Sequence, residues 1–512
     1  MVTRKLAYNW FISIVAAMCM VLYGYDASTF NAIQGSPHWL AWFGLSSEST
    51  YMLGLINTVY SIGAIVSGWF FGGPIADYFG RRVGMGLGCF VTICATMLQT
   101  FAPKGNLGCF MAGRVIVGVG QGMALTAGPV YIGEMAPPEI RGYIMAFWQT
   151  FYSVGAFIAY WINYACSLHR EKLGEWDWKM VVIFQILVPA IIIVLLPFQP
   201  ETPRWYIQKS GNVQAARAAL QRIRDTDAQV EEELMVIREA IEYEKEAISP
   251  GYGALFKDPS IRKRLYIAVV LNMGQQLTGQ GTLNSYSTAI YKKVWTSEKT
   301  ISLINALNAT FGILFTLNAV WTVDRFGRRW LLIVGAFGMS LCTMLVAIVG
   351  LTTPGTSTKS QPVGISIVFL LFFFIFFYKP SWGATVWIWT SEIFSMNVRA
   401  QAVGMCSQTQ NVAQAIFNQF FPIFLERQGL KCMFFFMAVN LCLAAFVWRF
   451  VPETKKVPLE EIDVLFGGAN HVDKGAQMLG VPGEQSGAHH VAEKDGRATV
   501  KEEEGRYALA PE

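Results

Sequence analysis

The sequence predicts an all-helical membrane protein whose twelve spanning helices form two bundles of six. Of its 512 residues, 53% are hydrophobic and only 15% are charged, and the mean hydropathy is +0.37. An ordinary soluble domain has about 25% charged residues. Long apolar runs recur along the chain, and two charged motifs each occur twice in the same order. Together these observations indicate a polytopic membrane protein built from a duplicated half.

The duplication rests on the spacing of the charged motifs. Residues 77–82 and 324–329 both read D-x-F-G-R-R, and each copy follows a long apolar run. A glutamate and an arginine seven residues apart come next in both halves: Glu134 with Arg141, and Glu392 with Arg399. A single match could arise by chance, whereas the ordered pair of matches indicates a repeated half.

A spanning helix needs about 20 predominantly apolar residues. The first candidate follows Arg4 and Lys5 and is interpreted as an uncleaved span rather than a signal peptide, because it is long, lacks an obvious cleavage site and precedes many other spans. Twelve candidates emerge, six before and six after a polar region: 9–33, 51–76, 83–101, 107–131, 142–165, 178–199, 264–291, 301–323, 330–351, 363–391, 400–424 and 431–451.

The polar region and the charged end of the chain set the domain boundaries. We expect four parts: an N-terminal bundle over 1–199, a cytoplasmic linker over 200–263, a C-terminal bundle over 264–451 and a mostly disordered cytoplasmic tail over 452–512. Inside the linker, apolar and charged residues alternate at helical spacing over 214–224 and 230–246. This pattern predicts short amphipathic helices, and a solvated linker without helices is the alternative.

Orientation follows from the basic residues in the loops. The loops at 77–82, 132–142, 200–264 and 324–329 are rich in arginine, so we expect them and both termini to face the cytoplasm. Some basic residues also occur on the opposite side, at 166–178 and 292–300. The membrane that fits best is the plasma membrane.

Composition argues against several other classes of protein. The formal net charge is only +5 and no basic stripe appears, so we expect no nucleic-acid partner. The nine cysteines show no metal-ligand spacing and the five histidines lie outside the spans, so we expect neither a metal site nor a cofactor. No set of nucleophile, base and orienting residue can be assembled, so an enzyme is least favoured.

Three ionisable residues lie inside predicted spans, where burial of a charge costs several kcal/mol. Asp26 in span 1 and Arg114 in span 4 can pair if the helices touch, and Asp26 then becomes a candidate proton carrier. A static ion pair that fixes helix packing is the alternative. Lys379 in span 10 either pairs with Asp26 or with backbone carbonyls freed by Pro380, or it faces a cavity and meets an anionic ligand.

Amide side chains mark a candidate substrate site. Gln276, Gln280 and Asn284 are spaced by four in span 7, beside Gln275, which predicts a shared helical face. Span 11 has a similar set. Amides supply both donors and acceptors for a hydroxylated ligand. The remaining candidates for substrate contact are Gln149, Trp387, Gln410, Asn411 and Gln414. Hydrogen bonds between helices and core packing are the alternative roles.

The repeated charges at the cytoplasmic ends of the spans are expected to form a gate. Such pairs would latch the two halves in one state and release them in another, although each exposed pair alone is weak. The expected members are Asp77, Arg81, Arg82, Glu134, Arg141, Glu201, Arg204, Asp324, Arg328, Arg329, Glu392 and Arg399.

These motifs resemble the sugar porter family of the major facilitator superfamily, in its fungal form. Apart from the repeated charges, the matching stretches include 24–26, 129–134, 200–205, 275–279 and 452–454, so that the resemblance covers about residues 9 to 455. It implies two six-helix bundles around a central site that works by alternating access. An aspartate at the position of Asp26 resembles the proton-coupled members, and Gln149, Gln275, Gln276 and Trp387 match positions that contact sugar.

The resemblance implies a proton-coupled sugar importer, with a sugar, a proton and the lipid bilayer as partners and a monomer as the expected state. The chain departs from the family pattern in three places: Gly279-Gln280-Gly281 lacks the usual asparagine, 383–387 lacks the usual prolines, and Gln410-Asn411 replaces Asn-Trp. These departures concern the substrate rather than transport. The alternatives are a proton-coupled carrier of sugar acids such as uronate or quinate, a passive facilitator, and a non-transporting sugar receptor.

Overall fold

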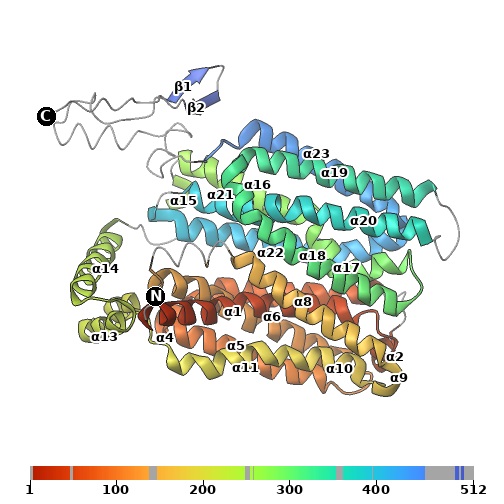
Figure 1. Ribbon diagram of the computed structural model, residues 1–512, viewed down its shortest axis with the longest axis horizontal. Helices are drawn as coiled ribbons and strands as arrows, with labels where there is room; N and C mark the ends of the chain where they lie inside the picture. Colours follow the sequence, from red (N-terminus) through yellow and green to blue (C-terminus); the bar gives the residue numbers. More distant parts are fainter. Residues whose placement is uncertain are drawn as a thin grey trace.

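A computed structural model of the chain describes residues 4–45, 50–137, 144, 147–247, 254–257, 259–352, 361–394, 396–455, 491–494 and 497–500. Within these residues the fold is helical apart from one antiparallel pair in the tail, β1 (Val491–Lys494) and β2 (Arg497–Val500). Figure 1 shows two layers of long helices, red to yellow for the N-terminal half and green to blue for the C-terminal half. The expected disorder of the rest of the tail lies outside the described residues.

The N-terminal half contains six spans, two of which are interrupted. They are α1 (Arg4–Ile33); α3 (Thr50–Val66) continued by η1 (Ser67–Phe71) and α4 (Gly72–Phe79); α5 (Arg81–Thr100); α6 (Leu107–Met135); α8 (Trp148–Leu168); and α10 (Trp176–Ile183) continued by η2 (Phe184–Ile186), α11 (Leu187–Leu195) and η3 (Leu196–Phe198). The short helices α2 (Pro37–Phe43) and α9 (Arg170–Leu173) connect them at one end.

The C-terminal half repeats this plan. Its spans are α16 (Pro259–Leu277) followed by α17 (Gln280–Lys292); α18 (Glu298–Phe326); α19 (Arg328–Thr352); α20 (Gln361–Tyr378) continued by η5 (Lys379–Thr385) and α21 (Val386–Glu392); α22 (Met396–Gln428), then η6 (Gly429–Cys432); and α23 (Met433–Phe450). The connector between the halves contains α12 (Pro203–Trp205), η4 (Tyr206–Ser210), α13 (Val213–Ile223), α14 (Asp227–Ala247) and α15 (Ala254–Lys257).

Nine stretches of the described chain are long and apolar enough to cross a membrane, and one of them, Ala402–Phe450, runs from within α22 to the end of α23. Two expected spans fall outside this set for a physical reason. Helix α8 carries many polar side chains, and α16 and α17 are separated by a break in the helix. Large apolar side chains such as Phe90, Phe369 and Phe420 are more than half exposed on the outside, as expected for a surface that meets lipid.

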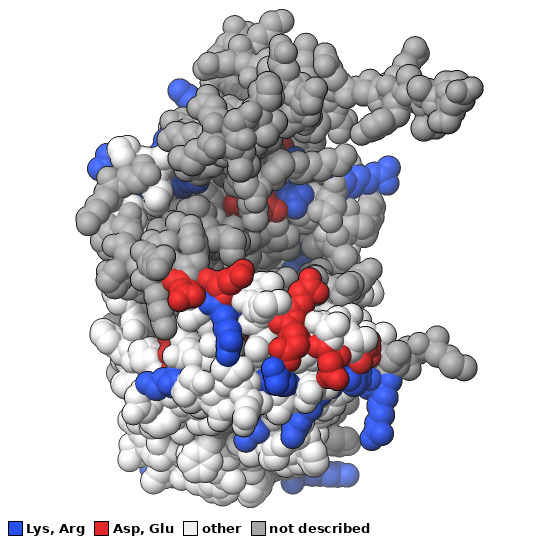
Figure 2. Space-filling model, turned by 90° about the vertical axis from the view of Figure 1, so that its left-hand side faces the viewer, with Lys and Arg blue, Asp and Glu red and all other residues white. Residues whose placement is uncertain are grey.

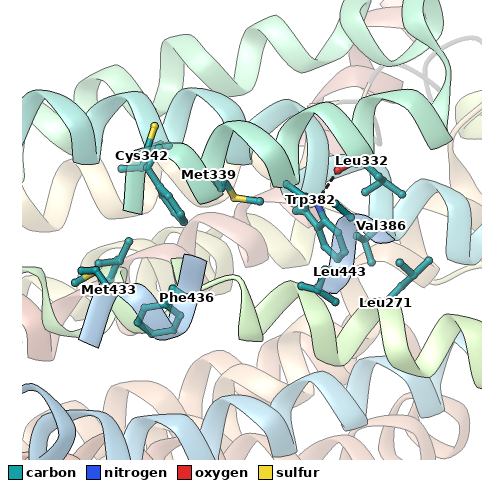
Figure 3. Packing of buried hydrophobic residues seen from close by; sticks show 14 of the residues in the cluster. Leu271, Leu332, Met339, Cys342, Trp382, Val386, Met433, Phe436 and Leu443 are labelled. Carbon is teal, nitrogen blue, oxygen red and sulfur yellow. Dashed lines mark hydrogen bonds between the residues drawn. The ribbon is translucent and has the colours of Figure 1, made fainter. Parts of the chain in front are cut away.

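Each half has its own apolar core. In the C-terminal half Trp382 is fully buried among Leu271, Val386 and Leu443, and its indole N–H donates to the carbonyl of Leu332 at 3.0 Å. Figure 3 shows this packing. The hydrogen bond satisfies the one polar atom of the side chain, so the whole indole is available for packing.

The expected amphipathic helices of the linker are present as α13 and α14. The apolar face of α13 packs against the N-terminal half, and Asn9 donates to the carbonyl of Ile223 at 2.8 Å. Arg224 pairs with Glu233 in the second turn of α14. We call this side of the molecule the linker face and the opposite side, which carries α2 and α9, the far face. Figure 2 shows charged side chains gathered on the linker face.

Candidate functional site

The seventh span is broken at a glycine. Gly279 has a φ of +101°, a conformation that residues other than glycine rarely adopt, and the ring of Phe436 comes within 2.8 Å of where a Cβ would be. The carbonyl of Thr278, which the break releases from the helix, accepts a hydrogen bond from Asn440 at 3.1 Å. The prediction that Gln276, Gln280 and Asn284 share one helical face was therefore wrong in its geometry, because the spacing of four assumes an unbroken helix.

The tenth span is interrupted by the π-helical segment η5, which begins at Lys379 and contains Pro380. A π-helix pairs each carbonyl with the N–H five residues on instead of four, so the change of register at this segment leaves carbonyl groups that need other donors. Gln275 supplies them, because its amide nitrogen donates to the carbonyls of Trp382 at 2.7 Å and Gly383 at 3.3 Å. One amide thus fixes the two interrupted spans to each other, and such interruptions often mark functional sites.

Lys379 stands at the start of this interruption and faces the N-terminal half. Its ammonium group donates to the hydroxyl of Ser153 at 3.0 Å and lies 5.7 Å from the ring centre of Tyr152. Ser153 in turn lies 3.2 Å from the hydroxyl of Thr316. Within the described part of the chain no carboxylate lies within ion-pair distance of Lys379, so the pairing with Asp26 that the sequence left open is absent.

A second polar contact crosses between the halves next to Lys379. The amide of Asn284 donates to the hydroxyl of Tyr152 at 3.0 Å, so Tyr152 meets both Lys379 and Asn284. The hydroxyl of Tyr160, two turns further along α8, donates to the backbone carbonyl of Asn284 at 3.3 Å. The structure therefore brings Gln275, Asn284 and Lys379 together around the two helix breaks.

The other predicted contact residues lie on α8, α16, α17 and α22. Gln149 lies in the first turn of α8, and Gln276 stands on the last turn of α16, before the break. Gln280 and Gln410 each have a buried side-chain oxygen with no hydrogen-bond partner in the described part. On α22, Gln414 is partly buried, and the amide of Asn411 donates to Gln408 at 3.4 Å.

The tryptophans of span 10 separate into two groups. Trp382 and Trp389 are fully buried, and their indole N–H groups donate to backbone carbonyls. Trp387, the predicted contact residue, is only partly buried. Trp382 and Trp389 belong to the packed core of the C-terminal half.

Asp26 and Arg114 meet in the N-terminal half, but not as an ion pair. The guanidinium group donates to the backbone carbonyl of Asp26 at 3.3 Å and lies 4.5 Å from the ring centre of Tyr60. The Asp26 carboxyl group accepts from the amide of Gln185 at 2.7 Å. Both charged residues have no exposed surface, and among the described residues Asp26 Oδ2 and Arg114 Nη2 have no hydrogen-bond partner.

On the linker face, the first copy of the charged motif holds helices of one half together. Arg81 pairs with Glu134 and with Asp77, each at 3.2 Å. Glu201 accepts the backbone N–H groups of Arg81 at 3.0 Å and Arg82 at 3.1 Å, which caps α5. Burial raises the pKa of Glu201, and these hydrogen bonds act against that shift.

The second copy reproduces this arrangement. Arg328 pairs with Glu392 at 2.9 Å, and Glu453 accepts the backbone N–H groups of Arg328 at 2.8 Å and Arg329 at 3.0 Å. Glu453 was missed as a site residue, although Pro452-Glu453-Thr454 repeats Pro200-Glu201-Thr202 in the sequence. On the linker face, the described ion pairs of the two motifs lie within each half, whereas the predicted latch requires pairs between the halves.

Three other expected gate residues lie outside the described residues, either wholly or by their side chains. Arg141 lies outside the described residues, as do the side chains of Asp324 and Arg399. Arg204 belongs to α12, one turn from Glu201. Its neighbour Trp205 donates to the carbonyl of Asp77 at 3.1 Å, which joins the linker to the first motif.

The far face holds the two halves together. Asn31 donates to the hydroxyl of Ser287 at 2.7 Å, and Thr288 donates to the carbonyl of Asn31 at 2.9 Å. Arg170 pairs with Glu298 across the seam and with Asp177 at 3.0 Å within its own half. The far-face ends of the halves are therefore in direct polar contact.

Comparison with known proteins decides the family. The family described as "Sugar (and other) transporter" matches residues 12–466. The chain belongs to this transporter family. The transporter is 30% identical over 490 residues to a probable quinate permease of Aspergillus fumigatus, covering 91% of this chain and 89% of the relative. It is 28% identical to a probable quinate permease of Aspergillus niger, with coverage of 91% and 89%.

Solved structures agree on the fold. The inward-open conformation of the xylose transporter XylE from E. coli matches with a TM-score of 0.75 and 24% identity, covering 90% of this chain and 100% of that chain. Its partially occluded inward-open conformation gives the same TM-score and identity, with coverage of 88% and 100%. The transporter is thus a multi-pass membrane protein with the major facilitator fold that the sequence predicted.

Proposed function

We propose that this transporter carries a polyhydroxylated carboxylate of the quinate or uronate type, together with a proton, by alternating access. The observation that carries the proposal is Lys379. Its ammonium group lies at the meeting of the two halves and has a hydroxyl group, rather than a carboxylate, as its described partner.

A lysine within a span needs a counter-charge, a cavity with water or deprotonation, because charge burial in a membrane is costly. An anionic ligand supplies the counter-charge, and a carboxylate accepts the donors of an ammonium group. The amide of Asn284 and the hydroxyl of Tyr152, which meet beside Lys379, are suited to hydroxyl groups on the same ligand. The composition of the site therefore matches a ligand with one carboxylate and several hydroxyls.

The relatives support the same class, since several are named probable quinate permeases. A neutral sugar is the second candidate, because the family is described by sugar transport. We assign the proton to Asp26, whose carboxyl group is buried with one oxygen free of partners in the described part. Movement of one anion with one proton would transfer no net charge.

The contacts across the seam suggest which state is shown. They join the halves on the far face, and the charged motifs of the linker face are satisfied within each half. We assign this arrangement to a state that is closed on the far face, and we expect the linker face to be cytoplasmic. Each chain carries both halves, so we expect a monomer in the plasma membrane to be the transport unit.

The test is uptake of labelled quinate, a uronate and a neutral hexose into cells that lack their own carriers, with and without a protonophore. We expect wild type and Lys379→Arg to accumulate the acids in a protonophore-sensitive way. We expect Lys379→Met to lose the acids selectively. Uptake of neutral sugars alone by wild type would overturn the anion assignment. Equilibration without accumulation would indicate a facilitator, and absence of all uptake by a correctly inserted protein would indicate a receptor.

A further inference from the structure

Within the described residues, the far face, which we expect to lie outside the cytoplasm, carries more basic than acidic residues. The positive-inside rule does not explain this excess, because that rule enriches the cytoplasmic side. In the described part, nine basic and five acidic residues lie in its loops and at the adjoining helix ends. The basic residues are Lys104, Arg170, Lys172, Lys179, Lys292, Lys293, Lys299, Arg427 and Lys431. The acidic ones are Glu171, Glu175, Asp177, Glu298 and Glu426.

Two of the cations border the seam between the halves, one from each half. Arg170 on α9 and Lys292 at the end of α17 line the same small cavity, together with Glu298, Ser36 and Ser302. The cavity volume is about 10 Å³, which is room for about one water molecule in this closed state.

The two cations differ in how they are neutralised. Arg170 has two carboxylate partners, Asp177 and Glu298. Lys292 donates to the backbone carbonyl of Gly35 at 3.4 Å and has no carboxylate within ion-pair distance among the described residues. Opening of the far face would separate Lys292 from Gly35, because the two lie on opposite sides of the seam.

We propose that Lys292, supported by the basic far face, forms an access site that attracts the carboxylate of the substrate before it reaches Lys379. This inference rests on the proposed function, since a neutral substrate would gain nothing from it. A mouth lined by an excess of one charge raises the local concentration of the opposite ion and speeds its association, most strongly at low ionic strength. The substrate would leave Lys292 for Lys379 as the far face closes.

The experiment compares Lys292→Gln with Lys293→Gln, a control that removes an equal charge from the exposed neighbouring lysine. Initial quinate uptake is measured in sealed vesicles with the far face outward, at low and at high ionic strength. We expect Lys292→Gln to raise the KM for quinate about fivefold at ~10 mM salt and to leave it within about twofold of wild type at ~1 M, where the Debye length is only about 3 Å. Lys293→Gln and Lys292→Arg should stay close to wild type at both.

Two other results would overturn the access site, and a third would overturn the proposed function. A defect of Lys292→Gln that persists at high salt would show that Lys292 acts by fixing the seam, and would overturn the access site. Equal behaviour of Lys292→Gln and Lys293→Gln would also overturn it, while quinate uptake by wild type would leave the proposed function standing. If wild type takes up neutral sugars and no quinate, the proposed function itself fails.

Discussion

The amide of Gln185 donates a 2.7 Å hydrogen bond to the carboxyl group of Asp26, and both side chains are buried. Gln185 lies in η2, a single turn of 3-10 helix within the sixth span. Gln185 is uncharged, whereas the guanidinium group of Arg114 binds the backbone carbonyl of Asp26. The carboxyl group of Asp26 is therefore oriented by an uncharged amide. This relationship shapes two predictions about proton coupling.

Replacement of Asp26 by Asn keeps the shape of the side chain and removes its titrating group. We expect loss of accumulation against a gradient, with exchange of bound substrate partly retained, because the central site around Lys379 is untouched. Uptake in the presence and absence of a protonophore measures accumulation, and counterflow measures the exchange of bound substrate. Full protonophore-sensitive accumulation by a correctly inserted variant would remove Asp26 from the coupling mechanism.

Replacement of Gln185 by Leu removes the donor that favours the ionised carboxyl group. We expect the alkaline limb of the pH profile of uptake to move to higher pH, with the KM for substrate little changed. The measurement is initial uptake as a function of external pH, with Gln185→Glu as a second variant at the same position. A uniform loss at every pH would instead indicate that Gln185 only supports packing.

Replacement of Glu453 by Gln weakens the cap of α19. The carboxylate accepts two backbone N–H groups at the helix start, and charged caps of this kind contribute about 1–2 kcal/mol. We expect a lower melting temperature in detergent and a similar decrease for Glu201→Gln, since the two glutamates have equivalent positions. Glu242→Gln on the exposed surface of α14 is the control and should melt as wild type does.

Topology can be tested with single cysteines placed at exposed positions. We expect Ser210→Cys on the linker face to be protected from an impermeant thiol reagent in intact cells, and Lys104→Cys on the far face to react. A background without the nine native cysteines is required. Reaction at Ser210→Cys and protection at Lys104→Cys would reverse the expected orientation.

The sequence predicted the spans and the charged repeats because both depend on local composition and spacing. It did not predict the breaks, because these depend on partners far away in the chain. Gly279 turns where the ring of Phe436 fills the space, and the interruption after Lys379 is held by the amide of Gln275. Gln185 was missed for a related reason: an amide in an apolar run is commonplace, and its significance appears only when Asp26 is beside it.

The caps on α5 and α19 also bear on how the protein could be divided. Glu201 and Glu453 each lie in the segment that follows the last span of the half whose helix they cap. A chain cut between α14 and α15 would therefore yield two fragments that each contain a complete motif and its own cap. In the described part of the chain, each charged cluster is built from residues of one fragment. We therefore expect two such fragments, expressed from separate reading frames, to reassemble in the membrane.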